Sequence, residues 1–154
     1  TTAVTGPAGI VAIGVPFVWL GMVVAISFLE TPLKFRTPGI TLGLALAVGR
    51  LVFRGLGVAE LTLACALTAA LVAARVLGGA RVGAAEGVLS GSLWLLLLVQ
   101  VGLLRPRLDR RVVRILAGDT PSRSLMHPTY IALEAVKVAV LLALGISLVR
   151  GNVP

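Results

Sequence analysis

Long apolar runs alternate with short basic segments along this chain. Four of the runs are long enough to cross a membrane, and they cover residues 8–29, 55–74, 87–104 and 128–149. An α-helix needs roughly 20 apolar residues to cross a hydrocarbon core about 30 Å thick. The pattern therefore predicts an all-α integral membrane protein, with four transmembrane helices in a single domain over residues 1–154.

A shorter apolar run follows the first span. Residues 37–49 carry no charge and are rich in glycine, but they are too few to cross a membrane alone. Joining them to the second span would give a helix over residues 39–74 that is about 54 Å long, at 1.5 Å per residue. Because that length exceeds a bilayer, we expect a break at residues 54–57, where glycine is present, and a separate interfacial or re-entrant helix over residues 37–53.

Two prolines, Pro32 and Pro38, stand between the first span and this interfacial segment. Proline lacks an amide hydrogen and disfavours a helical conformation in the residue before it. We therefore expect the first helix to end here and the next to begin. Phe35 and Phe53 are expected to anchor the segment against lipid or the bundle.

The connection before the fourth span has an amphipathic pattern. Its apolar residues Leu108, Val112, Ile115 and Leu116 share one helical face, and the opposite face carries arginines: Arg107, Arg110, Arg111 and Arg114. Pro106 suits a first helical turn. The pattern predicts a short helix over residues 106–117 on the cytoplasmic surface, where arginines contact anionic headgroups.

Composition strengthens the membrane assignment. Hydrophobic residues make up 58% of the chain and charged residues only 13%, far from the average for soluble proteins. The net charge of +8 alone would be compatible with nucleic acid binding. Aromatic residues, however, do not interleave with the basic ones as a stacking surface requires. We therefore expect a lipid bilayer, and not nucleic acid, to be the partner of the basic segments.

The basic residues lie mostly in two connections on one side of the predicted bundle. Ten of the fourteen Lys and Arg residues fall there: Lys34, Arg36, Arg50, Arg54, Arg105, Arg107, Arg110, Arg111, Arg114 and Arg123. Cytoplasmic loops of membrane proteins carry such an excess. We expect these residues to face the cytoplasm and the lipid headgroups, with both termini on the non-cytoplasmic side of a bacterial inner membrane.

Small residues recur four positions apart on three of the predicted spans. They are Gly21 and Ala25 on the first span, Ala66, Ala70 and Ala74 on the second, and Gly87 and Gly91 on the third. This spacing lets helix backbones approach closely. We expect these faces to pack against each other or against another subunit.

Three charged residues fall inside predicted spans: Glu60, Glu134 and Lys137. Each costs about 2.5–3.5 kcal/mol at a helix centre, so each needs a partner, a wet cavity or a route to the interface. Glu134 and Lys137 are three residues apart and share a helical face, which favours a mutually neutralising pair. Glu60 is expected to pair with one of three basic residues: Arg50, Arg54 or Lys137.

The functional alternative is a polar pocket near the inner leaflet. Its lining would comprise His127, Tyr130, Glu134 and Lys137, completed by Glu60 or Gln100. Taken alone, Gln100 is expected to hydrogen-bond a neighbouring helix. Such a pocket would suit a small cation, a proton or an amphipathic molecule.

The sequence supports no metal site. His127 is the only histidine and Cys65 the only cysteine, so a site with several nitrogen or sulfur ligands is not expected from this chain. We expect Cys65 to be a small buried apolar residue and His127 to lie at the start of the fourth span. A single axial ligand to haem is the open alternative for His127, and the cofactor is otherwise unassigned.

Three segments resemble a known family. "TPLKF" at residues 31–35 and "AVGRLVF" at residues 47–53 are similar to small four-span membrane proteins related to human transmembrane protein 205. In that family a Pro-hydrophobic-x-Phe turn closes the first span, and a Gly-x-hydrophobic-x-Phe segment leads into the second. "HPTYIALE" at residues 127–134 resembles the family's His-x-x-Ser-x-x-Leu-Asn, with His127 and Leu133 matching.

The chain departs from that family at two positions. Tyr130 stands where a serine is usual, and Glu134 stands where an asparagine is usual. The resemblance implies a four-helix membrane fold whose polar site has acquired a charge, with Lys137 as its counter-ion. It implies little chemistry beyond a loose association with drug and metal tolerance.

Function is therefore predicted by class only. The favoured hypothesis is a small accessory or scaffold protein beside a larger membrane complex, because small-residue helix faces are plentiful and catalytic constellations are missing. The alternative is a transporter or binder that acts as a homo-oligomer and uses the intramembrane polar pocket. A membrane enzyme acting on a lipid or a porphyrin is a third hypothesis, and the sequence leans against it.

Overall fold

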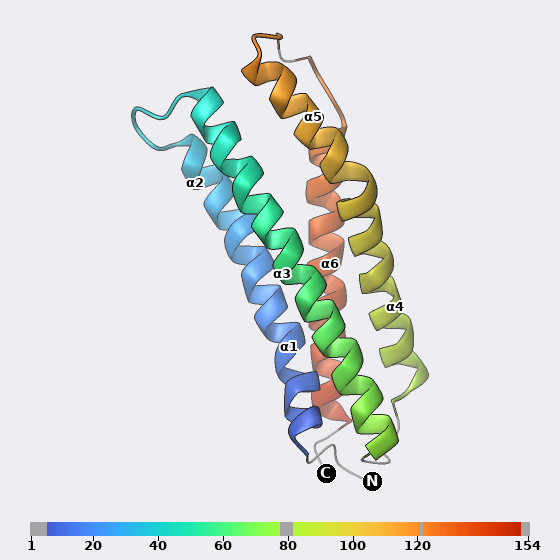
Figure 1. The fold of residues 1–154 in the computed structure, drawn as a ribbon. Helices are drawn as coiled ribbons and strands as arrows, with labels where there is room; N and C mark the ends of the chain where they lie inside the picture. The colour runs from blue at the N-terminus through green and yellow to red at the C-terminus, as the bar shows by residue number, and fades with distance from the viewer. Residues whose placement is uncertain (1–5, 78–81, 121, 152–154) are drawn as a thin grey trace.

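The structure is a computed structural model that describes residues 6–77, 82–120 and 122–151, and within these ranges it is helical, without strands. Four long helices stand side by side, and successive ones run in opposite directions (Figure 1). All four are long and apolar enough to cross a membrane, as the hydrophobic pattern predicts.

Two of the four long helices contain a π-helical segment. The first long helix comprises α1 (Pro7–Val23), the π-helical segment η1 (Val24–Glu30) and α2 (Thr31–Phe35). The third comprises α4 (Ala84–Val99), the π-helical segment η2 (Gln100–Leu104) and α5 (Arg105–Leu116). The second and the fourth are the single elements α3 (Leu42–Leu77) and α6 (Met126–Arg150). We call the end near Phe35 and Leu116 the loop end, and the end near Pro7 and Arg150 the terminal end (Figure 1).

Helix α3 is continuous, so the predicted break at residues 54–57 and the separate helix over residues 37–53 are wrong. Its 36 residues extend for about 54 Å at 1.5 Å per residue. A glycine inside a helix costs only about 1 kcal/mol relative to alanine, which packing against neighbouring helices offsets. The helix is longer than a bilayer core, and its first turns pack against α2 and α5 at the loop end.

The glycines of α3 make room for basic side chains from neighbouring helices. A Cβ atom at Gly57 would overlap the guanidinium group of Arg105. A Cβ atom at Gly49 would lie 2.9 Å from Nζ of Lys34, which is too close. At these two positions, glycine therefore permits a close approach between helices and does not end a helix.

Pro32 does not end the first helix, contrary to the prediction. It lies in the first turn of α2, and the helix continues to Phe35. Because α2 continues the first helix directly after η1, the proline removes one backbone hydrogen bond of this helix without ending it. The chain reverses beyond Phe35, where Gly39 takes a φ of +80° that suits glycine. The hydroxyl of Thr41 then accepts a hydrogen bond from the amide of Leu44 and caps α3.

The amphipathic helix forms at the predicted place but is not a separate element. Helix α5 begins at Arg105 and ends at Leu116, and it continues α4 through η2. None of its residues is fully buried, in keeping with its polar composition. Gly118, with a φ of +103°, follows its end, as is usual after a helix C-terminus.

The apolar core lies between α1, α3, α4 and α6. Helix α1 packs against both α3 and α6, and α4 packs mainly against α6. The buried apolar side chains include Leu67 and Leu71 of α3, Leu93 and Leu97 of α4, and Leu141, Leu144 and Leu148 of α6. Gly145 of α6 leaves the space that the ring of Phe17 of α1 occupies.

The small-residue faces divide into inner and outer ones. Ala70 and Ala74 are buried and Ala66 is half-buried, so the face of α3 packs within the bundle as expected. The remaining small residues, Gly21, Ala25, Gly87 and Gly91, are exposed and do not pack within this chain.

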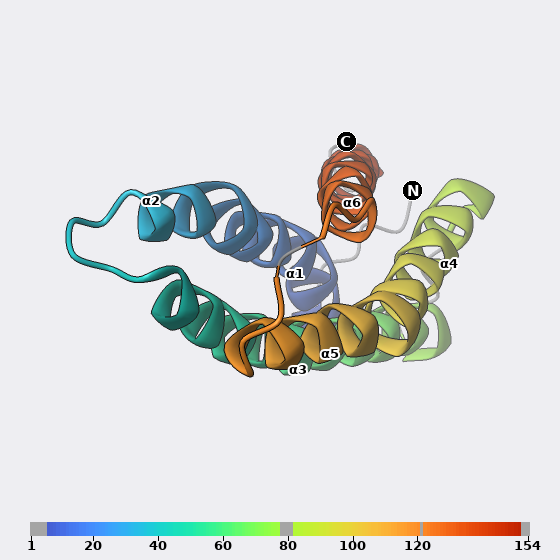
Figure 2. The ribbon, with the colours of Figure 1, turned by 90° about the horizontal axis from the view of Figure 1, so that it is seen from above.

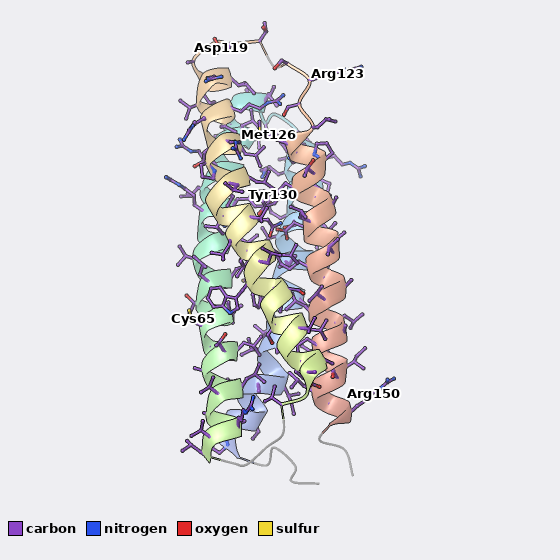
Figure 3. All side chains as sticks on the ribbon, turned by 90° about the vertical axis from the view of Figure 1, so that its right-hand side faces the viewer. Cys65, Asp119, Arg123, Met126, Tyr130 and Arg150 are labelled. Carbon is purple, nitrogen blue, oxygen red and sulfur yellow. The ribbon has the colours of Figure 1, made fainter. Side chains whose placement is uncertain are left out.

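Cys65 is also exposed, so its predicted burial is wrong. Figure 3 shows it on the outer side of α3. Its neighbours Ala64 and Leu67 occupy the inward side of the same helix, and the helical repeat turns residue 65 away from them.

Candidate functional site

Four buried or nearly buried charged residues meet between the helices, in the loop-end half of the bundle. Glu60 of α3, Arg105 of α5, and Glu134 and Lys137 of α6 form what we call the ion cluster. The side chains of Glu60, Glu134 and Lys137 are fully buried, and that of Arg105 is 13% exposed. Buried charges require partners, because desolvating an ion costs several kcal/mol.

Glu60 lies at the centre of the ion cluster. Its Oε1 accepts hydrogen bonds from Nζ of Lys137 at 2.5 Å and from Nε1 of Trp19 at 3.1 Å. Its Oε2 accepts a hydrogen bond from Nη2 of Arg105 at 2.9 Å. Both carboxylate oxygens are therefore satisfied, by donors from three other helical segments.

Glu134 gathers the second set of contacts. Its Oε1 accepts hydrogen bonds from Nζ of Lys137 at 3.0 Å and from Nε2 of Gln100 at 2.8 Å. Its Oε2 accepts a hydrogen bond from Oγ of Ser27 at 3.2 Å. Lys137 thus bridges the two carboxylates, so the predicted Glu134–Lys137 pair forms as part of a larger network.

Arg105 and Tyr130 cover the cluster on the side of the loop end. Nε and Nη2 of Arg105 donate hydrogen bonds to the Tyr130 hydroxyl at 3.1 Å and 2.9 Å. The Tyr130 ring meets the ring of Phe53 edge to face, with 5.7 Å between centroids. Arg105 reaches Glu60 by passing over Gly57, where any larger residue would obstruct it.

Both π-helical segments supply a hydrogen-bond donor to Glu134. Ser27 lies within η1, and Gln100 is the first residue of η2. A π-helical turn has one more residue than the α-helical turn and shifts the direction in which side chains point, and such turns are frequent at functional sites. Oε1 of Gln100 is buried and has no hydrogen-bond partner within the described residues.

The ion cluster is balanced in charge. Two carboxylates face one ammonium and one guanidinium group, so the four formal charges cancel. Every long helix contributes either a member of the ion cluster or a hydrogen-bond donor to it, and the donors Trp19 and Ser27 come from the first. A network of this kind specifies the rotation and the vertical register of each helix, because hydrogen bonds are directional and dispersion contacts are not.

A cavity of about 130 Å³ adjoins the cluster toward the loop end. It lies among α2, α3, α5 and the beginning of α6. Figure 2 shows these helices from above. Arg105 and Tyr130 line it, so these two side chains separate it from Glu60. Its other walls are largely apolar and include Phe35, Ala45, Leu46, Phe53, Leu108 and Val112.

Basic residues surround the apolar part of this α3–α5 cavity. Nε of Arg50 and Nε of Arg54 lie 3.4 Å and 3.6 Å from the same oxygen, Oδ2 of Asp109. Lys34 lies 3.3 Å from Glu30. Lys34 is only 8% exposed, so its side chain faces the bundle. The prediction that it faces the lipid headgroups is therefore wrong.

Most of the predicted pocket residues meet in one place. The ion cluster and its hydrogen-bond partners include Glu60, Gln100, Tyr130, Glu134 and Lys137. His127 is exposed and lines the α3–α5 cavity, and it is not among the hydrogen-bond partners of the cluster. Figure 3 shows Tyr130 in the half of the bundle near Asp119 and Arg123, with Arg150 at the opposite end.

Of the three partners predicted for Glu60, Lys137 is confirmed, whereas Arg50 and Arg54 pair with Asp109 instead. Arg50 and Arg54 lie about three and about two helical turns nearer the loop end than Glu60, and α5 brings Asp109 to them.

Sequence reasoning missed three members of the site: Trp19, Ser27 and Arg105. Arg105 was grouped with the loop arginines because it directly follows an apolar run. Arg105 directly follows the third span, and Gly57 lies opposite it on the second. This placement indicates that Arg105 points into the bundle only once it is known which helices pack together. Trp19 and Ser27 lie in an uncharged run, where nothing distinguishes an inward-facing polar group from an outward-facing one.

No family model, curated protein or solved structure matches this chain. The resemblance to small four-span proteins related to human transmembrane protein 205 therefore stays a prediction. Within the described residues, no group of three or more His, Cys, Asp and Glu side chains is placed to hold a metal ion.

Proposed function

We propose that this chain is a membrane protein that binds a small amphipathic molecule in the α3–α5 cavity. The observation that carries the proposal is that apolar and polar side chains line the same cavity. Its walls are largely apolar, and its polar lining includes Arg50, Arg54, Arg105 and Tyr130. Ligand sites combine mainly apolar walls with a few well-placed polar groups in this way.

The helix lengths suggest how the cavity sits relative to lipid. Glu60 lies about 26 Å along α3 from Leu77, and Lys137 lies about 20 Å along α6 from Arg150. If the terminal end lies at one boundary of a hydrocarbon core about 30 Å thick, Glu60 and Lys137 lie roughly 4 Å and 10 Å inside the other boundary. The cavity then lies at the level of the headgroups, where an amphipathic molecule has its polar end.

The distribution of basic residues favours a cytoplasmic location for this cavity. The loop end carries Arg36, Arg50 and Arg54 as well as the arginines of α5. An excess of Lys and Arg is typical of cytoplasmic segments. We therefore place the cavity at the cytoplasmic face of a bacterial inner membrane, with both termini on the other side.

A second candidate function is an accessory subunit of a larger membrane complex or a homo-oligomer. The observation that favours it is the outer face of α4, where Gly87 and Gly91 are exposed. A Cβ atom added at either glycine would meet nothing within 4 Å. Exposed small residues of this spacing allow another helix to approach closely.

One experiment separates the two functions. Native mass spectrometry of the full chain, released gently from its own membrane, weighs bound small molecules and bound polypeptides together. We expect a reproducible small added mass that disappears in Leu46→Trp, because Leu46 lines the cavity and a larger side chain would fill it. Leu44→Trp is the matched control, since Leu44 lies two residues away on α3 and is 54% exposed.

The opposite results are equally clear. An added mass that survives Leu46→Trp contradicts binding in this cavity. Added masses of whole polypeptides, lost when Gly87 and Gly91 are replaced by leucine, would favour the accessory subunit instead. A wild-type chain that carries neither kind of mass contradicts both functions in the membrane sampled.

A further inference from the structure

We infer that the polar end of the molecule bound in the α3–α5 cavity is an anion, received by Arg50 and Arg54. This inference rests on the proposed function and names the chemical class of its ligand. The sequence suggests a small cation, a proton or an amphipathic molecule as the ligand. The class inferred from the structure is narrower: a single-chain amphiphile that carries a phosphate or carboxylate head.

The first support is an imbalance of charge at the cavity. Arg50 and Arg54 share one carboxylate, because both lie within ion-pair distance of the same oxygen of Asp109. Among the described residues, no other acid lies within ion-pair distance of either arginine. One positive charge is therefore left over beside the largely apolar walls, on arginines whose side chains are 33% and 66% exposed.

The second support is a buried donor without a hydrogen bond. Nε of Arg50 lies 3.4 Å from Oδ2 of Asp109, but it makes no hydrogen bond to any described residue and its surface is buried. A buried polar group without a partner costs about 1–3 kcal/mol. An oxygen atom of a bound phosphate or carboxylate would satisfy this donor, because arginine forms strong charge-assisted bonds with these groups.

The third support is the absence of an acceptor for a cation. Asp109 is the one acidic residue among the described residues that line the cavity, and two arginines already occupy it. Glu60 faces away behind Arg105, where Lys137 and Arg105 hold both of its oxygens. A cationic head would meet four basic side chains of the lining, Lys34, Arg50, Arg54 and Arg105, and would be repelled.

The size of the cavity indicates one chain. Its volume of about 130 Å³ resembles that of an engineered cavity of about 150 Å³ that binds benzene. A single alkyl or aryl end fits such a space, whereas the two chains of a membrane phospholipid do not. We therefore commit to a single-chain amphiphile, and a phospholipid that inserts one of its chains becomes an outcome of the test.

The experiment compares three probes that share a ten-carbon chain. Decyl phosphate, decanol and decyltrimethylammonium have an anionic, a neutral and a cationic head on the same chain, and calorimetry measures their binding to the full chain in uncharged micelles. We expect decyl phosphate to bind about tenfold more tightly than decanol, which corresponds to one charge-assisted bond, and decyltrimethylammonium to bind most weakly.

Variants assign the preference to the two arginines. Arg50→Gln should remove most of the preference for decyl phosphate over decanol, and Arg54→Gln provides the same test if the first variant does not fold. Arg36→Gln is the control, because Arg36 is an exposed basic residue at the same end that does not line the cavity. A preference that persists in both Arg50→Gln and Arg54→Gln overturns the inference.

Failure of the inference is distinguishable from failure of the proposed function. If decanol and decyl phosphate bind equally and Leu46→Trp abolishes both, the cavity binds amphiphiles and only the anionic head is wrong. If no probe binds, both fail. Added phosphatidylglycerol identifies the source of the anion: displacement of decyl phosphate points to a membrane lipid, lack of displacement points to a free amphiphile, and both results uphold the anionic head.

Discussion

The two halves of the bundle are joined by different kinds of contact. In the loop-end half, the ion cluster and its hydrogen-bond partners connect all four long helices through charged and polar groups. In the terminal half, leucines dominate the interior, accompanied by interhelical hydrogen bonds from Trp94 to Thr68 and from Ser147 to Glu86. The ion pairs among the described residues lie in the loop-end half.

This difference teaches where the structure is most sensitive. Lipid chains are as apolar as leucine, so contacts between leucines hold helices together without a hydrophobic force between them. Such contacts adjust to small shifts. A buried ion pair does not adjust, because a partner that moves away leaves an uncompensated charge in a poorly solvating environment. We therefore expect substitutions of equal size to cost more in the loop-end half.

The largest effect is expected from Lys137→Met. This change removes the ammonium that bridges Glu60 and Glu134, so two buried carboxylates lose the charge between them. Breaking a buried ion pair costs about 3–5 kcal/mol. Titration with sodium dodecyl sulfate in mixed micelles measures the loss as a change in the free energy of unfolding.

The double variant Glu134→Gln/Lys137→Met is the control for this prediction. It removes one negative and one positive charge together, so the balance of the ion cluster returns and part of the stability should be restored. A single variant as stable as the original chain would show that the cluster does not hold the bundle together.

An intermediate effect is expected from Gly57→Ala. The new Cβ atom would displace the guanidinium of Arg105, which loses its ion pair with Glu60 and its bonds to Tyr130. Hydrogen bonds to charged groups contribute about 1.5–3 kcal/mol, so we expect a loss of about 2 kcal/mol in the same unfolding titration.

Gly55→Ala is the matched control on the same helix. A Cβ atom at Gly55 would meet nothing within 4 Å, and alanine is the better helix former by about 1 kcal/mol. Gly55→Ala should therefore be neutral or stabilising. If both alanine variants behave alike, the close approach of Arg105 to α3 is not needed.

The smallest effect is expected from Gly145→Ala in the terminal half. A Cβ atom there would lie 2.7 Å from the Phe17 ring, which is also too close. Phe17 is 39% exposed and makes apolar contacts only through its ring, so it can turn outward toward lipid. Part of the strain is relieved by this movement, and we expect a loss below about 1 kcal/mol. A cost equal to that of Gly57→Ala, measured in the same way, would remove the distinction between the halves.

Much of the fold follows from hydrophobic length alone. The runs over 8–29 and 128–149 lie within the helices Pro7–Phe35 and Met126–Arg150. The exceptions are helix ends. Pro32 and the glycines at residues 54–57 suggest breaks in the helices, but the structure does not contain these breaks. Local propensities differ by only about 1 kcal/mol for glycine, so contacts with a neighbouring helix decide such positions.

The candidate site was predictable to a similar extent. Glu60, Glu134 and Lys137 stand out in the sequence because a charge in an apolar run is costly without a partner. The roles of Trp19 and Ser27 were not predictable, since a polar group in a long apolar helix acquires its importance from the residue opposite it. The α3–α5 cavity was not predictable either, because four separate helical segments line it.

The sequence by itself determined that this protein has four apolar helices, which residues interrupt them with charge, and which end collects most of the basic side chains. These properties depend on the length of apolar runs and on the spacing of charges, both of which are local. Only the tertiary structure decided that Lys137 bridges Glu60 and Glu134, that Arg105 passes over Gly57, and that Arg50 shares Asp109 with another arginine. Those contacts depend on the rotation and register of helices far apart in the chain, and a buried charge selects its partner only after the helices have packed.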